Sequence, residues 1–337
     1  MATKVGINGF GRIGRGFLRI LEAREETSLE VVAINDLVNV DNLAYLLKYD
    51  TVHGRFDGTV EVDGNNMIVN GKKIEVTAET DPANLGWDDK GVDLVIEATG
   101  VFRKRAQIAK HLEAGAKKVI LTVPAKDEID ATIVLGVNDD DLSADDEIVS
   151  NASCTTNCLA PLAKALNDEF GIAKGLITTV HGYTATQKVL DAPAKKVRRG
   201  RTAAQNIIPT TTGAAIATTK VLPELEGKID GKALRVPVPN GSCVDGVFLL
   251  DVDETSVEEV NAALKAKAEG EMKGILGYTE EPLVSTDIMG LADSSLVDAK
   301  ATQMVDKNLV KIISWYDNEY GYTNRVIDLA EKVVGMM

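Results

Sequence analysis

The fold of this chain is decided by residues 4–14, which read KVGINGFGRIG. A short apolar run ends at Asn8, and Gly9, Gly11 and Gly14 follow with the spacing G-x-G-x-x-G ahead of a helical pattern. The first glycine permits a tight turn, the second lets the backbone approach a pyrophosphate, and the third allows close helix-strand packing. A helix N-terminus adds free N–H groups and a positive dipole end. The stretch therefore predicts a dinucleotide-binding loop.

The residues around this loop agree with that prediction. We expect a strand over Lys4–Asn8, a helix over Ile13–Glu25 and a second strand over Glu30–Asn35, which together make a βαβ unit. Asp36 ends the second strand, close to the offset expected for the carboxylate that accepts from the ribose hydroxyls. A carboxylate there would repel a 2′-phosphate, so NAD is favoured over NADP. An ordinary glycine-rich turn would not require all these features together.

Alternating strands and helices continue to about residue 150. The expected elements are a helix over Val40–Tyr49, an antiparallel insertion over Thr59–Thr77, strands over Val92–Glu97, Lys118–Leu121 and Ala131–Leu135, and a helix over Arg105–Gly115. Longer strands follow. They are expected over Leu176–His181, Lys232–Pro237, Val244–Val252 and Leu309–Tyr316, with helices over Thr155–Phe170, Ser256–Gly270 and Asn324–Val334.

These patterns predict an α/β protein with two domains. The first is a Rossmann-type dinucleotide-binding domain over residues 1–152, to which the C-terminal helix 318–337 returns. The second, over residues 153–317, is an α+β catalytic domain with a large, mainly antiparallel sheet.

Composition excludes several classes of function. The chain has 337 residues, 45% hydrophobic and 26% charged, with a formal net charge of −14. Nucleic-acid or anionic-membrane binding as a main function needs a broad basic surface, which this balance disfavours. Three cysteines make no disulfide framework, and the strand-like start leaves no room for a signal peptide. We expect a cytoplasmic protein.

The candidate nucleophile is Cys154. It falls at the start of a predicted helix, where N–H groups and the helix dipole favour the thiolate. Most lone intracellular cysteines are structural, and Cys158, one turn further on, is expected to be an inert packed thiol. His181 favours a catalytic role for Cys154 over a structural one. It ends an apolar strand, where it could stabilise the thiolate and relay a proton. His111 lies in a Lys-rich helix and is expected at the solvated surface. No metal-ligand cluster appears.

Cations and hydroxyls gather in two segments of this otherwise acidic chain. Residues 195–201 read KKVRRGR and residues 210–213 read TTTG, and Arg235 ends a predicted strand. A basic run is usually a solvated loop. Hydroxyls, backbone N–H groups and guanidinium groups are also what phosphate oxygens require, but spacing alone does not show that these residues converge.

Several ordered motifs make the chain resemble the phosphorylating glyceraldehyde-3-phosphate dehydrogenases along nearly its whole length. They are SNASCTTNC at 150–158, VHGYTATQ at 180–187, ATGVF at 98–102, NIIPTTTGAA at 206–215, LRVP at 234–237 and WYDNEYGY at 315–322. The resemblance implies that Cys154 attacks an aldehyde, that hydride passes to NAD, and that inorganic phosphate cleaves the resulting thioester, with His181 as base.

The resemblance also assigns binding residues. Ser153, Thr155, Thr212 and Gly213 would hold the attacking phosphate, Thr184, Arg199 and Arg235 the substrate phosphate, and Gly9, Gly11, Arg12, Ile13, Gly14, Asp36, Thr99, Thr122 and Asn318 the cofactor. It further implies a homotetramer, with the segment from Thr184 to Arg201 at a subunit interface.

The chain departs from the family pattern in places. The loop containing Ala192-Pro193-Ala194-Lys195-Lys196 is unusually lysine-rich, and Ala192 is similar to NADP-using members, which leaves NADP possible. Ile216 stands where many relatives have Lys, and no catalytic effect is expected from it. Two other functions stay open: an erythrose-4-phosphate dehydrogenase, which ends in acid release without phosphate attack, and a redox-sensing role of Cys154.

Overall fold

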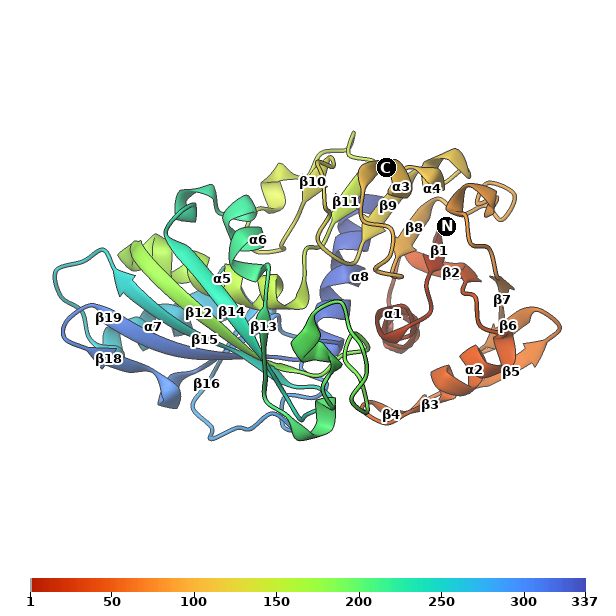
Figure 1. Ribbon diagram of the computed structural model, residues 1–337. Helices are drawn as coiled ribbons and strands as arrows, with labels where there is room; N and C mark the ends of the chain where they lie inside the picture. Colours follow the sequence, from red (N-terminus) through yellow and green to blue (C-terminus); the bar gives the residue numbers. More distant parts are fainter. Residues whose placement is uncertain (1) are drawn as a thin grey trace. The chain divides into compact units, whose positions relative to one another are not determined.

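The computed structural model describes residues 2–337 and divides into two compact units (Figure 1). The first unit comprises the chain up to residue 133, residues 139–152 and residues 323–337. The second comprises residues 134–138 and 153–322.

The first unit is built on a nine-stranded sheet with the order β10-β11-β9-β8-β1-β2-β7-β6-β5. Its strands are β1 (Thr3–Asn8), β2 (Leu29–Asn35), β5 (Val60–Asp63), β6 (Asn66–Val69), β7 (Lys72–Thr77), β8 (Leu94–Glu97), β9 (Lys118–Leu121), β10 (Ala131–Thr132) and β11 (Ile148–Ser150). Its helices are α1 (Arg12–Ala23), α2 (Val40–Lys48), α3 (Arg105–Ile108), α4 (Lys110–Glu113) and, from Thr323 onward, α8 (Tyr320–Val334). A small pair, β3 (Tyr49–Asp50) and β4 (Gly54–Arg55), lies apart, and short 3-10 turns occupy Pro82–Asn84 (η1) and Asp139–Asp141 (η2).

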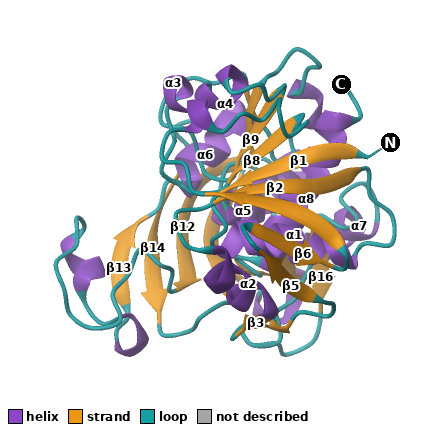
Figure 2. Ribbon diagram, turned by 90° about the vertical axis from the view of Figure 1, so that its right-hand side faces the viewer, coloured by secondary structure: helices purple, strands orange, loops and turns teal. Residues whose placement is uncertain are grey.

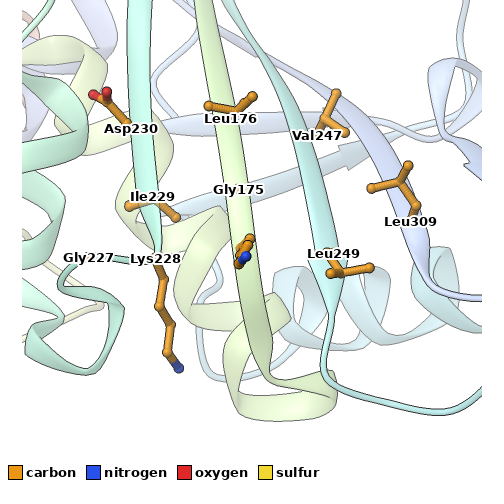
Figure 3. A pocket seen from close by; sticks show the side chains of 10 residues that line it. Gly175, Leu176, Gly227, Lys228, Ile229, Asp230, Val247, Leu249 and Leu309 are labelled. Carbon is orange, nitrogen blue, oxygen red and sulfur yellow. The ribbon is translucent and has the colours of Figure 1, made fainter.

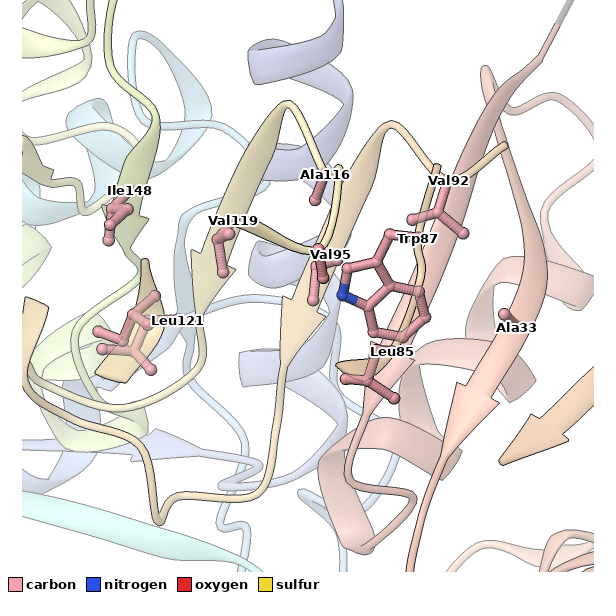
Figure 4. Packing of buried hydrophobic residues seen from close by; sticks show 11 residues of the cluster. Ala33, Leu85, Trp87, Val92, Val95, Ala116, Val119, Leu121 and Ile148 are labelled. Atoms are coloured by element: carbon pink, nitrogen blue, oxygen red, sulfur yellow. The ribbon is translucent and has the colours of Figure 1, made fainter. Parts of the chain in front are cut away.

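Parallel pairing explains why this sheet forms. β1 pairs in parallel with both β2 and β8, and only β5 and β6 add antiparallel ladders. Central parallel strands are buried on both faces, and β8 accordingly has three apolar residues in succession, Leu94 to Ile96, before the buried Glu97. Between this sheet and the segment leading to α4 lies a core in which Trp87 packs among Val92, Val95 and Ala33 (Figure 4). The expected Rossmann-type fold and the antiparallel insertion are confirmed.

Two predictions in this unit need correction. The expected helix over Arg105–Gly115 is two single turns, α3 and α4, because the peptide N–H groups of Leu112 and Gly115 bond three residues back rather than four. His111 is fully buried and not at the surface. It lies on the inner side of α4, where Trp87 Nε1 donates to its Nδ1 over 3.0 Å.

The second unit is built on an eight-stranded sheet with the order β13-β14-β12-β15-β19-β17-β16, and β18 pairs with β19 beside this path. Figure 2 shows β13, β14 and β12 side by side at one edge of this sheet. Its strands are β12 (Ile172–Gly182), β13 (Ile208–Thr211), β14 (Ile229–Val236), β15 (Ser242–Leu250), β16 (Leu276–Thr279), β17 (Ser295–Asp298), β18 (Gln303–Val305) and β19 (Leu309–Tyr316). Its helices are α5 (Cys154–Phe170), α6 (Ala214–Val221) and α7 (Val257–Glu269), with short 3-10 turns at Val197–Gly200 (η3), Ala203–Gln205 (η4), Pro223–Leu225 (η5) and Ala299–Ala301 (η6).

This sheet is mainly antiparallel, as expected. β12 pairs in parallel with β14 and β16 with β17, and the other pairings are antiparallel. Residues alternate in burial along β12: Ile177, Thr179 and His181 are buried, whereas Leu176 on the opposite face is 71% exposed. Helix α5 packs against β12, β15, β17 and β19. The face under α5 is therefore the one that carries polar groups into the interior.

No helix in residues 2–337 combines the length and the apolar character that a membrane span requires.

Candidate active site

Cys154 is the first residue of α5, as the sequence predicts. Ser153 caps the helix, its Oγ accepting from the Thr156 N–H over 3.1 Å. Ala152, just before the cap, has a φ of 52°, a left-handed conformation that a residue with a side chain rarely adopts. The turn therefore aims Cys154 at the helix N-terminus, where free N–H groups favour negative charge on sulfur.

His181 faces this thiol from the end of β12. Its Nε2 lies 3.5 Å from Cys154 Sγ. Arg235 is its neighbour across the parallel β12–β14 ladder, and the Arg235 Nη1 lies 2.7 Å from His181 Nδ1 and donates to the Gly182 carbonyl over 2.9 Å. Sheet register sets the imidazole beside the guanidinium, and the packing of α5 on the sheet brings the thiol to them.

Burial and charge set the protonation of this cluster. Burial raises the pKa of the Cys154 thiol, while Arg235 and hydrogen bonds from Thr155 lower it. Burial, followed by repulsion from Arg235, lowers the pKa of His181 to about 3. An imidazole with so low a pKa is neutral at physiological pH, so one of its nitrogens can accept a proton.

Tyr316 supports the cluster, and sequence reasoning assigned it no role. Its hydroxyl bridges Thr155 Oγ1 and Thr179 Oγ1, each at 2.9 Å, and its ring meets His181 edge-on with centroids 5.9 Å apart. The only sequence signal was the alternation in β19, which turns Tyr316 and Ser314 to the inner face. Tyr316 thus fixes the start of α5 against β12.

The second cysteine of the motif plays a different part. Cys158 is fully buried, with its sulfur 3.5 Å from Ser295 Oγ, and burial raises its pKa to about 12. A thiol in this state is a poor nucleophile, so the expectation of an inert packed residue is confirmed.

Asn318 is held in the same unit as the thiol. Its Oδ1 accepts from Ser242 Oγ over 2.6 Å, and that hydroxyl in turn accepts from the Gly182 N–H over 3.1 Å. Because its Oδ1 is occupied by the serine, the Asn318 amide group is fixed in orientation and its Nδ2 is available as a donor. Ser242 is a supporting residue that the sequence did not reveal.

Two of the predicted phosphate-binding residues, Arg199 and Thr184, lie in one group of threonine hydroxyls. Arg199 Nε donates to Thr210 Oγ1 over 3.0 Å, and its Nη1 lies 3.5 Å from Thr186 Oγ1, which is itself 2.9 Å from Thr184 Oγ1. Within residues 2–337, Arg235 Nε is buried without a hydrogen-bond partner. A buried donor without an acceptor is costly, and an anion would satisfy it.

Thr212 and Gly213 lie at the N-terminus of α6. Gly213 is the N-cap residue, and Thr212 Oγ1 accepts from the Ala214 N–H over 3.1 Å. The geometry thus offers a hydroxyl and a helix N-terminus to an anion.

The glycine-rich loop in the first unit has the expected geometry. Gly9 has a φ of 93°, and a Cβ there would lie 2.7 Å from the Thr99 nitrogen. A Cβ on Gly14 would lie 2.2 Å from the Gly9 oxygen, whereas one on Gly11 would meet no atom within 4 Å. The first and third glycines are needed for packing, and Gly11 leaves open space over the start of α1. These residues fit a bound dinucleotide.

Asp36 is positioned beside this loop. Its Oδ2 accepts from the Phe10 N–H over 2.8 Å and its Oδ1 from the Val38 N–H over 3.1 Å. Each oxygen keeps a lone pair, and Leu37 next to it is 65% exposed. Arg12 and Ile13 are the first two residues of α1. Arg12 forms an ion pair with Asp50. Hydrogen bonds and charge from the Arg12 guanidinium outweigh burial and lower the pKa of Asp50 to about 2.

A buried polar network underlies Thr99 and Thr122. Glu97 Oε1 accepts from the Thr99 N–H over 2.9 Å, and Glu97 Oε2 lies 3.0 Å from His111 Nε2. Because an indole N–H only donates, Trp87 must donate to His111 Nδ1, and the His111 proton sits on Nε2 toward Glu97. Thr122 Oγ1 donates to the Glu97 carbonyl over 3.1 Å. The histidine assigned to the surface therefore supports the segment that carries Thr99.

Comparison with known proteins agrees with this geometry. Residues 3–105 match the NAD binding domain of glyceraldehyde 3-phosphate dehydrogenase, and residues 153–318 match its C-terminal domain. The chain is 60% identical over 334 residues to glyceraldehyde-3-phosphate dehydrogenase from Priestia megaterium, covering 99% of this chain and 98% of that protein.

The chain belongs to the glyceraldehyde-3-phosphate dehydrogenase family.

Other family members are equally similar. The chain is 61% identical over 331 residues to glyceraldehyde-3-phosphate dehydrogenase 1 of Bacillus subtilis, with 98% of each chain covered. It is 59% identical over 330 residues to glyceraldehyde-3-phosphate dehydrogenase A of Escherichia coli strain K12, again with 98% of each covered. The resemblance drawn from the motifs is confirmed, and the glycine-rich loop belongs to an NAD-binding domain, as predicted.

Proposed function

We propose that this chain oxidises D-glyceraldehyde 3-phosphate to 1,3-bisphosphoglycerate with reduction of NAD, as a glycolytic and gluconeogenic enzyme. The supporting observation is the cluster of Cys154, His181 and Arg235, with 3.5 Å between Sγ and the imidazole. The names of its relatives support the same substrate.

The residues suggest how the reaction proceeds. Cys154 sulfur attacks the aldehyde carbon, its proton passes to His181, and His181 then gives that proton to the substrate oxygen, which yields a thiohemiacetal. Bound NAD would supply the hydride acceptor for that carbon. His181, neutral again, takes the hydroxyl proton, and Cys154 then carries a thioester. Inorganic phosphate then attacks the thioester carbon, the carbon–sulfur bond breaks, and Cys154 leaves as thiolate. Arg235 stabilises the thiolate both before attack and on departure.

Binding roles follow from the two groups of hydroxyls and cations. We propose that Thr184, Arg199 and Arg235 hold the phosphate of the substrate, and that Ser153, Thr155, Thr212 and Gly213 hold the attacking phosphate. Cofactor contacts are proposed for Gly9, Gly11, Arg12, Ile13, Gly14, Asp36, Thr99, Thr122 and Asn318. The proposed domains are residues 1–152 with 318–337 for NAD, and residues 153–317 for catalysis.

We propose further that the protein is a cytoplasmic homotetramer. The face of the second sheet opposite α5 supports self-association, because a groove there is lined by Leu176, Val247, Leu249 and Leu309 (Figure 3). Apolar surface gathered on one sheet face is typical of an interface.

Dependence on phosphate tests the proposed reaction. NAD reduction with glyceraldehyde 3-phosphate should require phosphate or arsenate, whereas an erythrose-4-phosphate dehydrogenase would turn over without either. Turnover unaffected by removing both anions would overturn the phosphorylating assignment.

A substitution tests the covalent step. Cys154→Ser should abolish turnover, because a serine hydroxyl is a far weaker nucleophile than a thiol. The matched control is Cys158→Ser, in a buried thiol without a proposed chemical role, which should retain turnover. If Cys154→Ser keeps full activity, the thiol acts only as an oxidisable group.

A further inference from the structure

The lysine-rich loop brings one of its two adjacent lysines to Thr211, the residue before the proposed phosphate-binding Thr212. Lys196 is the N-cap residue of η3, and its Nζ donates to Thr211 Oγ1. Lys195 is exposed, and its side chain makes no hydrogen bond or ion pair with the residues that the structure describes. The loop therefore directs Lys196, and not Lys195, toward β13.

The place that Lys196 occupies is next to the proposed site of the attacking phosphate. Thr211 directly precedes Thr212 and Gly213, the hydroxyl and the helix start assigned to that anion. Arg199, three residues after Lys196 in the same turn, lies 3.5 Å from the carbonyl of Thr211 through its Nη2. One residue of β13 is thus contacted by two cations.

No carboxylate compensates for this charge. Among residues 2–337, Lys196, Arg199 and Arg235 form no ion pair with Asp or Glu, although the chain has a net charge of −14. Burial, followed by repulsion from Arg199 and Arg235, lowers the pKa of Lys196. Cations held together without a counter-charge are costly unless an anion joins them.

We propose that Lys196 adds a cation to the inorganic-phosphate site of Ser153, Thr155, Thr212 and Gly213 and sets the affinity for the attacking anion. This rests on the proposed function. The guanidinium groups offer planar, directional donors, whereas an ammonium group on a flexible stem is a compact point charge that can follow a mobile anion. Because Lys196 bonds the residue beside Thr212, its effect falls on inorganic phosphate more than on the phosphate of the aldehyde.

Phosphate binding to the protein without substrate tests the proposal. The dissociation constant of inorganic phosphate is measured from the rise in unfolding temperature with phosphate concentration. Lys196→Gln, which keeps a donor for Thr211 but removes the charge, should weaken binding about 3- to 10-fold, and Lys196→Arg should restore most of it. Lys195→Gln, which removes the same charge one residue away, should leave the constant unchanged.

Steady-state kinetics give the second measurement. In Lys196→Gln the KM for phosphate should rise by the same factor, while kcat at saturating phosphate and the KM for the aldehyde stay near those of the unsubstituted protein. An unchanged phosphate constant in Lys196→Gln, an equal loss in Lys195→Gln, or a rise confined to the aldehyde would overturn the inference. The failure of the proposed function would appear separately, as absent or phosphate-independent turnover in the unsubstituted protein.

Discussion

At the scale of single residues, Arg235 controls the chemistry of two neighbours at once. Its positive charge lowers the pKa of the Cys154 thiol and also lowers the pKa of His181. Both effects have the same cause, because a nearby cation favours a thiolate and disfavours an imidazolium. Arg235 therefore partly offsets the rise that burial causes in the pKa of the Cys154 thiol, and together with burial it keeps the His181 imidazole neutral.

Removal of this charge should make the thiol less reactive. In Arg235→Gln the apparent pKa for alkylation of Cys154 by iodoacetamide should rise by roughly one unit, because the attraction to the thiolate is lost. The pH dependence of the alkylation rate measures this shift. Arg201→Gln is the control, since Arg201 is ion-paired to Asp191 on the surface. An unchanged or lowered apparent pKa would contradict the role assigned to Arg235.

His181 should make the folded state sensitive to acid. Its pKa is about 3 when folded, against about 6.5 in an unfolded chain, so the unfolded state binds more protons between these values. Stability from this group is fully present above pH 6.5 and is lost as the pH falls toward 3. In His181→Asn, the slope of unfolding free energy against pH should decrease by up to about 1.4 kcal/mol per pH unit in this window. Urea unfolding at several pH values measures it, and an unchanged slope would refute the assignment.

At the scale of elements, the contact between the loop and α1 depends on the absence of side chains. A Cβ at Gly14 would lie 2.2 Å from the Gly9 oxygen, which is backbone and cannot move without shifting the turn. Gly11 has no such neighbour, so its small size leaves space that only a bound molecule would use. The same motif thus contains two glycines required for packing, Gly9 and Gly14, and one, Gly11, whose small size we propose is required for NAD binding.

Two alanine substitutions should separate these requirements. Gly14→Ala should lower the unfolding temperature and weaken NAD binding, because α1 must move away from β1. Gly11→Ala should unfold near the temperature of the unsubstituted protein and still bind NAD about tenfold or more weakly, since the methyl group occupies the pyrophosphate approach. Calorimetry and NAD titration followed by fluorescence measure both. Equal losses of stability in the two variants would show that Gly11 is also a packing glycine.

At the scale of the whole molecule, one face of the second sheet leaves apolar side chains exposed. The sheet of the second unit is covered by α5 on one face, while Leu176 on the other is 71% exposed and borders an apolar groove. An exposed apolar sheet face costs free energy in water unless another surface covers it. This is the structural basis for the proposed self-association.

A charge on that face should reduce the oligomeric state. Leu176→Lys places an ammonium group in the proposed interface and should lower the mass measured by light scattering, because burying an unpaired charge is costly. Ile216→Lys is the control: Ile216 is 66% exposed on α6, outside the groove. If Leu176→Lys keeps the mass of the unsubstituted protein, the groove is not an interface.

Local sequence was sufficient for much of this protein. The glycine spacing, the helix start at Cys154 and the strand ends at Asp36 and His181 follow from turn geometry, capping and periodicity, which depend on neighbours a few residues apart. The family motifs then named the candidate site residues. Local signals also placed the buried Cys158 correctly.

Tertiary structure decided the side-chain contacts between residues that are far apart in the sequence. Only the β12–β14 register sets Arg235 against His181, and only the pairing of β15 with β19 brings Tyr316 to Thr155 and Thr179. His111 was misplaced because lysines on its helix suggested a solvated face, whereas its burial depends on Trp87 and Glu97, 24 and 14 residues away. Short-range patterns encode the elements, but long-range pairing sets the charges and hydrogen bonds that a buried group experiences.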